Sequence, residues 1–221
     1  MSKRAIAVAV PGLIVLFTGA AVGAGGWAVV TLETLPDHGL TAQPMVLDFT
    51  IRQHGVAPLE GLRPRVEARS GGREVTVPAA SGSRPGRYSA ALTLPSPGDW
   101  TVTIHTGFGA NRSVLLPIEV VDKAPARPVT EPDRGKRLFV AKGCASCHLH
   151  REVAATVLAD VGPDLTNRRY QLDYLKRYLA NPAIMASRTA DSKMPNLGLK
   201  PAEIGALAAF INAERQTVTG H

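Results

Sequence analysis

The chain has 221 residues, including 17 prolines and 21 glycines, and this length suits one or two domains separated by turn-rich segments. Its net charge is +7, and the largest local excess is modest, with thirteen Lys and Arg against nine Asp and Glu over residues 130–221. Because no basic run or aromatic platform accompanies this charge, the composition excludes a nucleic-acid-binding protein. A modest basic docking face and an ordinary solvated surface are both compatible with it.

An uncharged run of 28 residues, Ala5–Leu32, lies near the start of the chain. Since about 20 apolar residues span a bilayer, the run predicts an N-terminal transmembrane helix, with residues 1–33 as a membrane anchor. Lys3 and Arg4 precede the run and acidic residues follow it, which predicts a single-pass protein of the cell membrane with a cytoplasmic N-terminus. The remaining domains would then lie on the extracytoplasmic (periplasmic) side. A cleaved signal peptide is the alternative, because small residues near Ala24 form a passable cleavage site.

Residues 34–42 are a polar connector, after which the apolar period changes to two. Residues 45–52 alternate between apolar and polar side chains, which predicts a half-buried strand. Five further segments show similar strand patterns: 62–68, 73–79, 87–95, 99–106 and 113–121. Six or seven short strands at this spacing predict an antiparallel β-sandwich over residues 43–122. Pro117 predicts an edge position for its strand.

The stretch "GRYSAALTLPSPGDWTVTI" resembles the immunoglobulin-like modules of bacterial copper-handling and cytochrome-oxidase assembly proteins. The resemblance covers residues 43–122 and raises the question of a copper site, which needs converging His or Met ligands. The candidates are Met45, His54 and His105. His105 shares the polar face of its strand with two threonines, as a solvent-facing histidine does, so copper binding here is the minor alternative.

Three prolines in "DKAPARPVTEPD" predict a semi-rigid linker at residues 123–129, which if extended could hold the next domain away from the sandwich. Helical signals follow. Thr130 can cap a helix that Gly143 ends, "QLDYLKRYLA" predicts a second helix, and "KPAEIGALAAFINAE" predicts the last one. Residues 130–221 are therefore predicted to form an all-α domain.

The two cysteines of the chain, Cys144 and Cys147, stand three positions apart with His148 directly behind. A thioredoxin-like pair would need a surrounding βαβ pattern, which is missing. Structural zinc needs four ligands, and the other histidines are scattered: His38, His54, His105, His150 and His221. A disulfide would leave His148 unexplained. The C-x-x-C-H run is the attachment signature of c-type haem, so we predict one covalent haem c.

Residues 130–215 resemble a class I cytochrome c domain through "RGKRLFVAKGCASCH", "GPDL", "KMPNLGL" and the last helix. The resemblance implies that Cys144 and Cys147 form the thioethers, that His148 is the proximal iron ligand and that Met194 is the distal one. It also implies that the Pro163 carbonyl accepts the other ring N–H of His148.

It further places two residues of the first helix, Gly135 and Phe139, where that helix crosses the last one near Leu207 and Phe210.

Met185 is the rival distal ligand, because it also follows His148 at a separation that can close a loop over the haem. Pro195 favours an extended backbone at Met194, whereas Met185 follows "NPAI", which predicts a short helical turn. Methionine in such a turn is more often core filling, so Met194 is the preferred ligand.

Axial ligation by histidine and methionine leaves no open iron site, so we expect a one-electron carrier rather than an enzyme, with no small-molecule substrate. The expected partner is a redox protein or a membrane respiratory complex. The alternative is a haem-containing assembly or redox-sensing factor for a terminal oxidase, in which the β module binds a partner or copper. The β segment has no cysteine, which excludes a dinuclear copper centre there.

Overall fold

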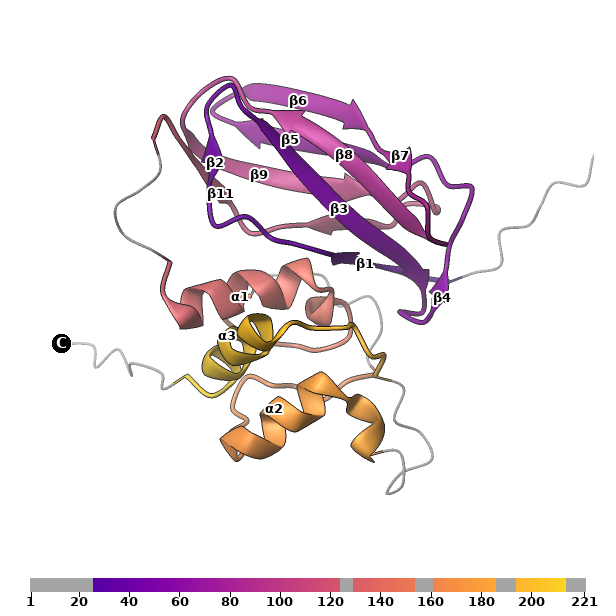
Figure 1. Ribbon diagram of the computed structural model, residues 1–221, viewed down its shortest axis with the longest axis vertical. Coiled ribbons are helices and arrows are strands. Elements are labelled where there is room, and N and C mark those ends of the chain that lie inside the picture. The colour runs from indigo at the N-terminus through magenta and orange to yellow at the C-terminus, as the bar shows by residue number, and fades with distance from the viewer. Residues whose placement is uncertain (1–25, 124–128, 154–160, 186–193, 214–221) are drawn as a thin grey trace, which may run out of the picture.

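The computed structural model describes residues 26–123, 129–153, 161–185 and 194–213. A two-layer β sandwich occupies the N-terminal part of this range and packs against a small helical domain formed by the C-terminal part (Figure 1).

The first sheet is antiparallel throughout. Its strands follow the order β1 (Ala28–Leu32), β3 (Pro44–Gln53), β8 (Arg87–Thr93) and β7 (Ala80–Ser81), with β4 (Ala57–Pro58) also paired to β3. The alternation expected over residues 45–52 is found in β3, where Met45, Leu47, Phe49 and Ile51 are buried. Period-two burial therefore sets which face of this sheet meets the other layer.

The second sheet closes the sandwich. Its strands follow the order β2 (Gly39–Leu40), β11 (Ile118–Val121), β9 (Gly98–His105), β5 (Arg65–Ser70) and β6 (Arg73–Pro78), with β10 (Arg112–Val114) also paired to β9. The β2–β11 pair is parallel. The strand expected over 113–121 is divided into β10 and β11, and Pro117 lies between them, because proline has no N–H to donate to the ladder.

The predicted N-terminal transmembrane helix is wrong. Residues Ala28–Leu32 of the uncharged run form strand β1, and the part of the chain that the structure describes has no helix long and apolar enough to cross a membrane. All five residues of β1 are buried, because alternate side chains enter the sandwich core while Val29 and Thr31 face the helical domain. A strand buried on both faces is apolar without interruption, which is the same pattern as a membrane segment. Residues 5–25 of the run lie outside the described residues.

Three α-helices build the described part of the C-terminal domain: α1 (Glu131–Ala141), α2 (Leu172–Ala180) and α3 (Pro201–Ile211). The Thr130 hydroxyl accepts the Asp133 N–H at 3.3 Å and caps α1, as the sequence predicted. Gly143 follows the end of α1 with φ 81°, a conformation that favours glycine.

The crossing of α1 and α3 is the tightest packing in this domain. A Cβ atom on Gly135 would overlap the Ala206 carbonyl oxygen and lie 2.7 Å from Phe210 Cβ, so the two backbones touch at a residue without a side chain. The Phe139 and Phe210 rings meet edge to face with centroids 5.7 Å apart. These residues lie where the resemblance places the crossing.

The two domains are in direct contact, contrary to the expectation that the linker holds them apart. Carbonyl groups at the end of β1 and in the segment after it, together with the Asp37 carboxylate, bind side chains of α1 and of Lys142, which follows α1. Residues 124–128 of the linker lie outside the described residues. In Figure 1 the sandwich rests on α1 through the β1 edge of its first sheet.

Candidate haem-attachment site

A single 3₁₀ turn, η1 (Cys144–Ser146), begins at the first cysteine, and Cys147 and His148 directly follow it. The Cys144 carbonyl accepts the N–H groups of Cys147 at 3.1 Å and His148 at 2.9 Å, which closes the turn and fixes the three residues relative to one another. Both cysteines are free, so they do not form a disulfide.

The thiols of this turn have raised pKa values. Burial raises the pKa of Cys144 to about 12, and burial also raises the pKa of Cys147. Redox exchange needs a thiolate with a lowered pKa, so the environment of the pair argues against thioredoxin-like chemistry.

The His148 ring is oriented by one hydrogen bond. Its Nδ1 lies 3.0 Å from the Pro163 carbonyl oxygen, and because a carbonyl can only accept, Nδ1 carries the proton. Nε2 then has a free lone pair for a metal. Burial lowers the pKa of His148, partly opposed by the Pro163 hydrogen bond, and this favours the neutral ring that binds iron.

Gly162 makes this orientation sterically possible. A Cβ atom there would lie 2.5 Å from His148 Cε1 and Nδ1 and 2.7 Å from the Cys147 carbonyl oxygen. Only glycine therefore lets the segment before Pro163 approach the ring. The "GPDL" motif contained this residue, but sequence reasoning gave it no role.

Met194 is half-buried and packs against the hydrophobic core that Cys144 also contacts. The turn after it is held by the Asn196 side chain, whose Oδ1 accepts the Gly198 N–H at 2.9 Å. Met185 ends the short turn η2 (Pro182–Met185), as its sequence context predicted. The choice of Met194 over Met185 as distal ligand stays a prediction.

These residues fit a covalently attached haem. Two unbonded thiols are held by one turn, a neutral imidazole is oriented by its second nitrogen, and a thioether side chain packs against the same hydrophobic core as Cys144. Cys144 and Cys147 would hold the haem edge, and His148 and Met194 would supply the axial ligands.

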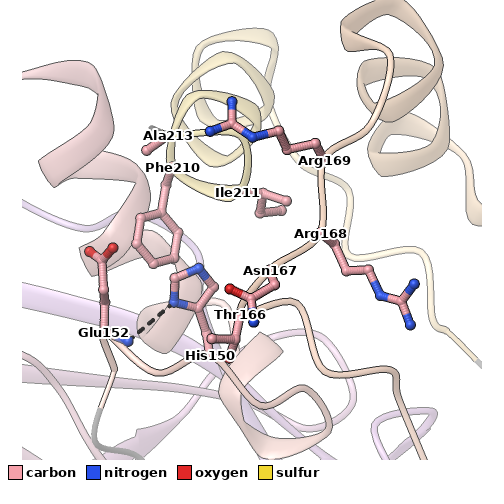
Figure 2. A pocket seen from close by; sticks show the side chains of 9 residues that line it. All are labelled: His150, Glu152, Thr166, Asn167, Arg168, Arg169, Phe210, Ile211 and Ala213. Carbon is pink, nitrogen blue, oxygen red and sulfur yellow. Dashed lines mark hydrogen bonds between the residues drawn. The ribbon is translucent and has the colours of Figure 1, made fainter. Parts of the chain in front are cut away.

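A pocket of about 180 Å³ lies elsewhere in the helical domain (Figure 2). It is lined by His150, Glu152, Thr166, Asn167, Arg168, Arg169, Phe210, Ile211 and Ala213, and so by none of the residues predicted to hold haem. The His150 ring packs on Phe210 with centroids 4.3 Å apart, and its Nδ1 accepts the Glu152 N–H at 3.4 Å. Burial lowers the pKa of His150, which favours a neutral core histidine.

The three candidate copper ligands of the sandwich do not converge. Met45 and His54 stand near opposite ends of β3, about 30 Å apart for an extended strand. His105 Nε2 instead lies 3.6 Å from Glu67 Oε2. Within the described ranges, no three His, Cys, Asp or Glu side chains are grouped to bind a metal.

Lys142, two residues before Cys144, is a buried residue that sequence reasoning missed. Its Nζ donates to the carbonyl oxygens of Leu32 at 2.8 Å and Glu33 at 3.1 Å, and lies 2.8 Å from Glu203 Oε1. Its own carbonyl accepts the Thr31 hydroxyl at 3.4 Å. One side chain therefore joins the end of α1 to the start of α3 and to β1, and no local pattern marks it.

A second polar contact lies one turn earlier on α1. Arg137 donates to the carbonyl oxygens of Asp37 at 2.6 Å and Pro36 at 3.2 Å, and Arg134 lies 3.3 Å from the Asp37 carboxylate. Burial lowers the pKa of Arg137, and the Asp37 carboxylate partly opposes this shift. The connector between β1 and β2 is thus fixed to α1.

Residues 132–213 match the family model of cytochrome c. None of the curated proteins is similar to the chain. Among solved structures, trypsin-activated α-2-macroglobulin from Escherichia coli is 18% identical over 47% of this chain and 7% of its own, with a TM-score of 0.38. A superoxide reductase (neelaredoxin) from Ignicoccus hospitalis is 18% identical over 47% of this chain and 88% of its own, with a TM-score of 0.32. The chain thus spans less than a tenth of the macroglobulin.

The family match and the geometry of the turn concern the same segment. The match supports a class I cytochrome c domain over residues 132–213, and this domain binds haem c covalently. A haem-based electron-transfer function follows for this part of the chain. The roles of Cys144, Cys147, His148, Pro163 and Met194 stay predictions of the resemblance.

Proposed function

We propose that the protein is an extracytoplasmic one-electron carrier that exchanges electrons with a redox partner protein or a respiratory complex. The observation that carries the proposal is the His148–Pro163 hydrogen bond of 3.0 Å beside two unbonded thiols, in a segment that matches cytochrome c. It orients a neutral imidazole where an iron ligand is required.

The side chains of the site have separate tasks. Bound haem supplies a one-electron redox couple at its iron. Cys144 and Cys147 tether the cofactor, and His148 keeps its Nε2 lone pair directed away from Pro163. Met194 would offer a soft sulfur ligand. With His148 and Met194 both bound to the iron, no position would be left for oxygen or another small molecule, so the site would transfer electrons without binding a substrate.

The extracytoplasmic location rests on two features of the sequence. Lys3 and Arg4 before an uncharged run are typical of an export segment, and C-x-x-C-H haem attachment takes place outside the cytoplasm. An alkaline phosphatase fusion after His221 tests the location, because the enzyme is active only when exported. An inactive but full-length fusion would contradict it.

A redox titration of the purified holoprotein tests the carrier function. We expect a reversible transition of the haem absorbance with the slope of a one-electron couple, and a reduced protein that binds carbon monoxide only slowly. Rapid carbon monoxide binding by the unmodified protein would contradict it, because it would show an open iron position.

Paired methionine variants assign the distal ligand. Met194→Ala should abolish the weak sulfur-to-iron charge-transfer band, lower the reduction potential and admit carbon monoxide, since the soft sulfur ligand is gone. Met185→Ala is the control and should keep the band. Loss of the band in the Met185 variant with retention in the Met194 variant would reverse the assignment.

The alternative role is a haem-containing assembly or redox-sensing factor whose β module binds a partner or copper, and its copper-binding form has no support in the arrangement of Met45, His54 and His105 described above. Copper titration of the holoprotein, followed by the paramagnetic signal of bound copper, distinguishes the two roles. Stoichiometric binding that is lost on His105→Ala would favour the alternative.

A further inference from the structure

We propose that the β sandwich is a positioning element of the haem site, in which β1 and the turn after β3 hold both the Cys144 turn and the Met194 loop. The inference rests on the proposed function, since it takes Met194 as an axial ligand. It gives the sandwich a role in the same molecule rather than a site for a separate partner.

The first contact joins β1 to the attachment turn. A Cβ atom on Gly143, the residue before Cys144, would overlap Val29 Cγ1 and lie 2.8 Å from the Val30 carbonyl oxygen. Gly143 is itself buried, and its φ of 81° also favours glycine. The backbone that leads into the haem-binding cysteines therefore lies directly on strand β1.

The second contact joins the sandwich to the distal loop. Gly55, in the turn between β3 and β4, is buried, and its Cβ position lies 3.6 Å from Pro195 Cγ and 3.6 Å from Val29 Cγ2. Pro195 directly follows Met194. Figure 1 shows the β4 end of the sandwich above the segment that leads into α3.

Val29 is common to both contacts. One of its methyl groups lies on Gly143 and the other lies beside Gly55, which in turn meets Pro195. The side chain is 5% exposed although it points away from the sandwich core. Packed interiors transmit small displacements, so a shift of β1 or of the Gly55 turn would move the segments that carry both axial ligands.

Polar contacts fix the sandwich in this position. Lys142, next to Gly143, donates to two carbonyls at the end of β1 and pairs with Glu203 in α3. Separating the domains would break both bonds from Lys142 to these carbonyls, whereas its pair with Glu203 lies within the helical domain. The sandwich is therefore held against the helical domain by hydrogen bonds as well as by packing.

Two asparagine variants of the full-length holoprotein test the proposal. Gly55→Asn adds a side chain against Pro195 and Val29, whereas Gly61→Asn is a matched control, because Gly61 has a similar φ of 67° and nothing within 4 Å of its Cβ position. Asparagine tolerates this backbone region, so strain is nearly equal in the two variants. The readouts are hydrogen exchange at residues 196–199 and carbon monoxide binding to the reduced protein.

We expect Gly55→Asn to raise both rates by about tenfold over Gly61→Asn, because a displaced loop opens more often. Equality of the two variants in either readout overturns the proposal. Both variants should keep one covalent haem and a one-electron titration. If the unmodified protein has no covalent haem or shows no one-electron titration, the proposed function is overturned instead. The two failures are therefore distinguishable.

A second pair removes packing without changing the backbone. Val29→Ala should raise the rate of hydrogen exchange at residues 196–199 and the rate of carbon monoxide binding. Val46→Ala, on the exposed face of β3 with 57% exposure, should leave both rates unchanged. If Val29→Ala behaves as Val46→Ala does, β1 does not position the haem-site segments and the proposal fails.

Discussion

The β sandwich and the helical domain fill their interiors differently. The sandwich buries large side chains from both of its sheets, including Trp100 and Phe49, which have no exposed surface. The helical domain packs most tightly where Gly135 meets α3, while α2 buries only Leu175 and Leu179. We therefore expect the sandwich to fold without a cofactor, whereas the helical domain depends on haem and on its contacts with β1.

The largest effect should come from removing both thiols. Cys144→Ser/Cys147→Ser should contain no covalent haem by mass spectrometry and should lose much of its helical circular dichroism, because the helical domain loses its cofactor. Both tryptophans of the chain, Trp27 and Trp100, lie in the sandwich part, so their near-ultraviolet signal should persist.

Ser146→Ala, within the same turn, is the control and should keep the haem. Covalent haem in the double cysteine variant would refute the attachment site. Loss of the tryptophan signal together with the helical signal would refute the independence of the sandwich.

Breaking the buried ion pair that joins the end of α1 to α3 within the helical domain should have the next largest effect. Lys142→Met leaves Glu203 charged and buried without its cation, which costs about 3 to 5 kcal/mol of unfolding free energy. Denaturant unfolding of the holoprotein measures this loss. Lys142→Met/Glu203→Gln should recover part of it, since no unpaired charge is left. Equal losses in the single and double variants would show that the pair is not the cause.

The α1–α3 crossing tests the packing of the helical domain. Gly135→Ala should lower the unfolding free energy by about 1 to 3 kcal/mol, because the new methyl group meets the Ala206 backbone. Gly205→Ala, also helical but with its nearest neighbour 4.0 Å away, should raise it by about 0.5 to 1 kcal/mol. Thermal unfolding followed at the haem absorbance measures both. Similar shifts in the two variants would contradict the close crossing.

The sequence predicted those parts of the fold that depend on local patterns. The alternation in β3 and the cap at Thr130 lie within a few residues of their causes, so strand and helix ends were found. The membrane helix was wrong because β1 is buried on both faces, and a single sequence cannot distinguish this burial from a bilayer.

Long-range contacts explain what the sequence did not predict at the site. The C-x-x-C-H motif indicated haem from adjacent residues alone. The role of Lys142 depends on the Leu32 carbonyl, 110 positions away, and that of Gly55 on Pro195 in the other domain. Neither contact leaves a pattern in the neighbouring residues.

The smallest expected effect comes from removing the cap of α1, and it tests whether the two domains unfold in separate transitions. Thr130 caps α1 through its hydroxyl, which accepts the Asp133 N–H at 3.3 Å, and Thr130→Ala removes this acceptor at a cost of about 1 kcal/mol. In a cooperative unit of the size of the helical domain, such a loss lowers the melting temperature by about 4 to 8 °C. Because the cap belongs to the helical domain, the shift should appear in the haem absorbance, while the transition followed by tryptophan should stay in place. Thr130→Ser keeps an oxygen acceptor and should restore the original transition. An equal shift of both transitions would show that the two domains unfold as one unit. The contacts of Lys142 and Val29 between the domains would then determine the unfolding behaviour more than the difference in packing between the two interiors.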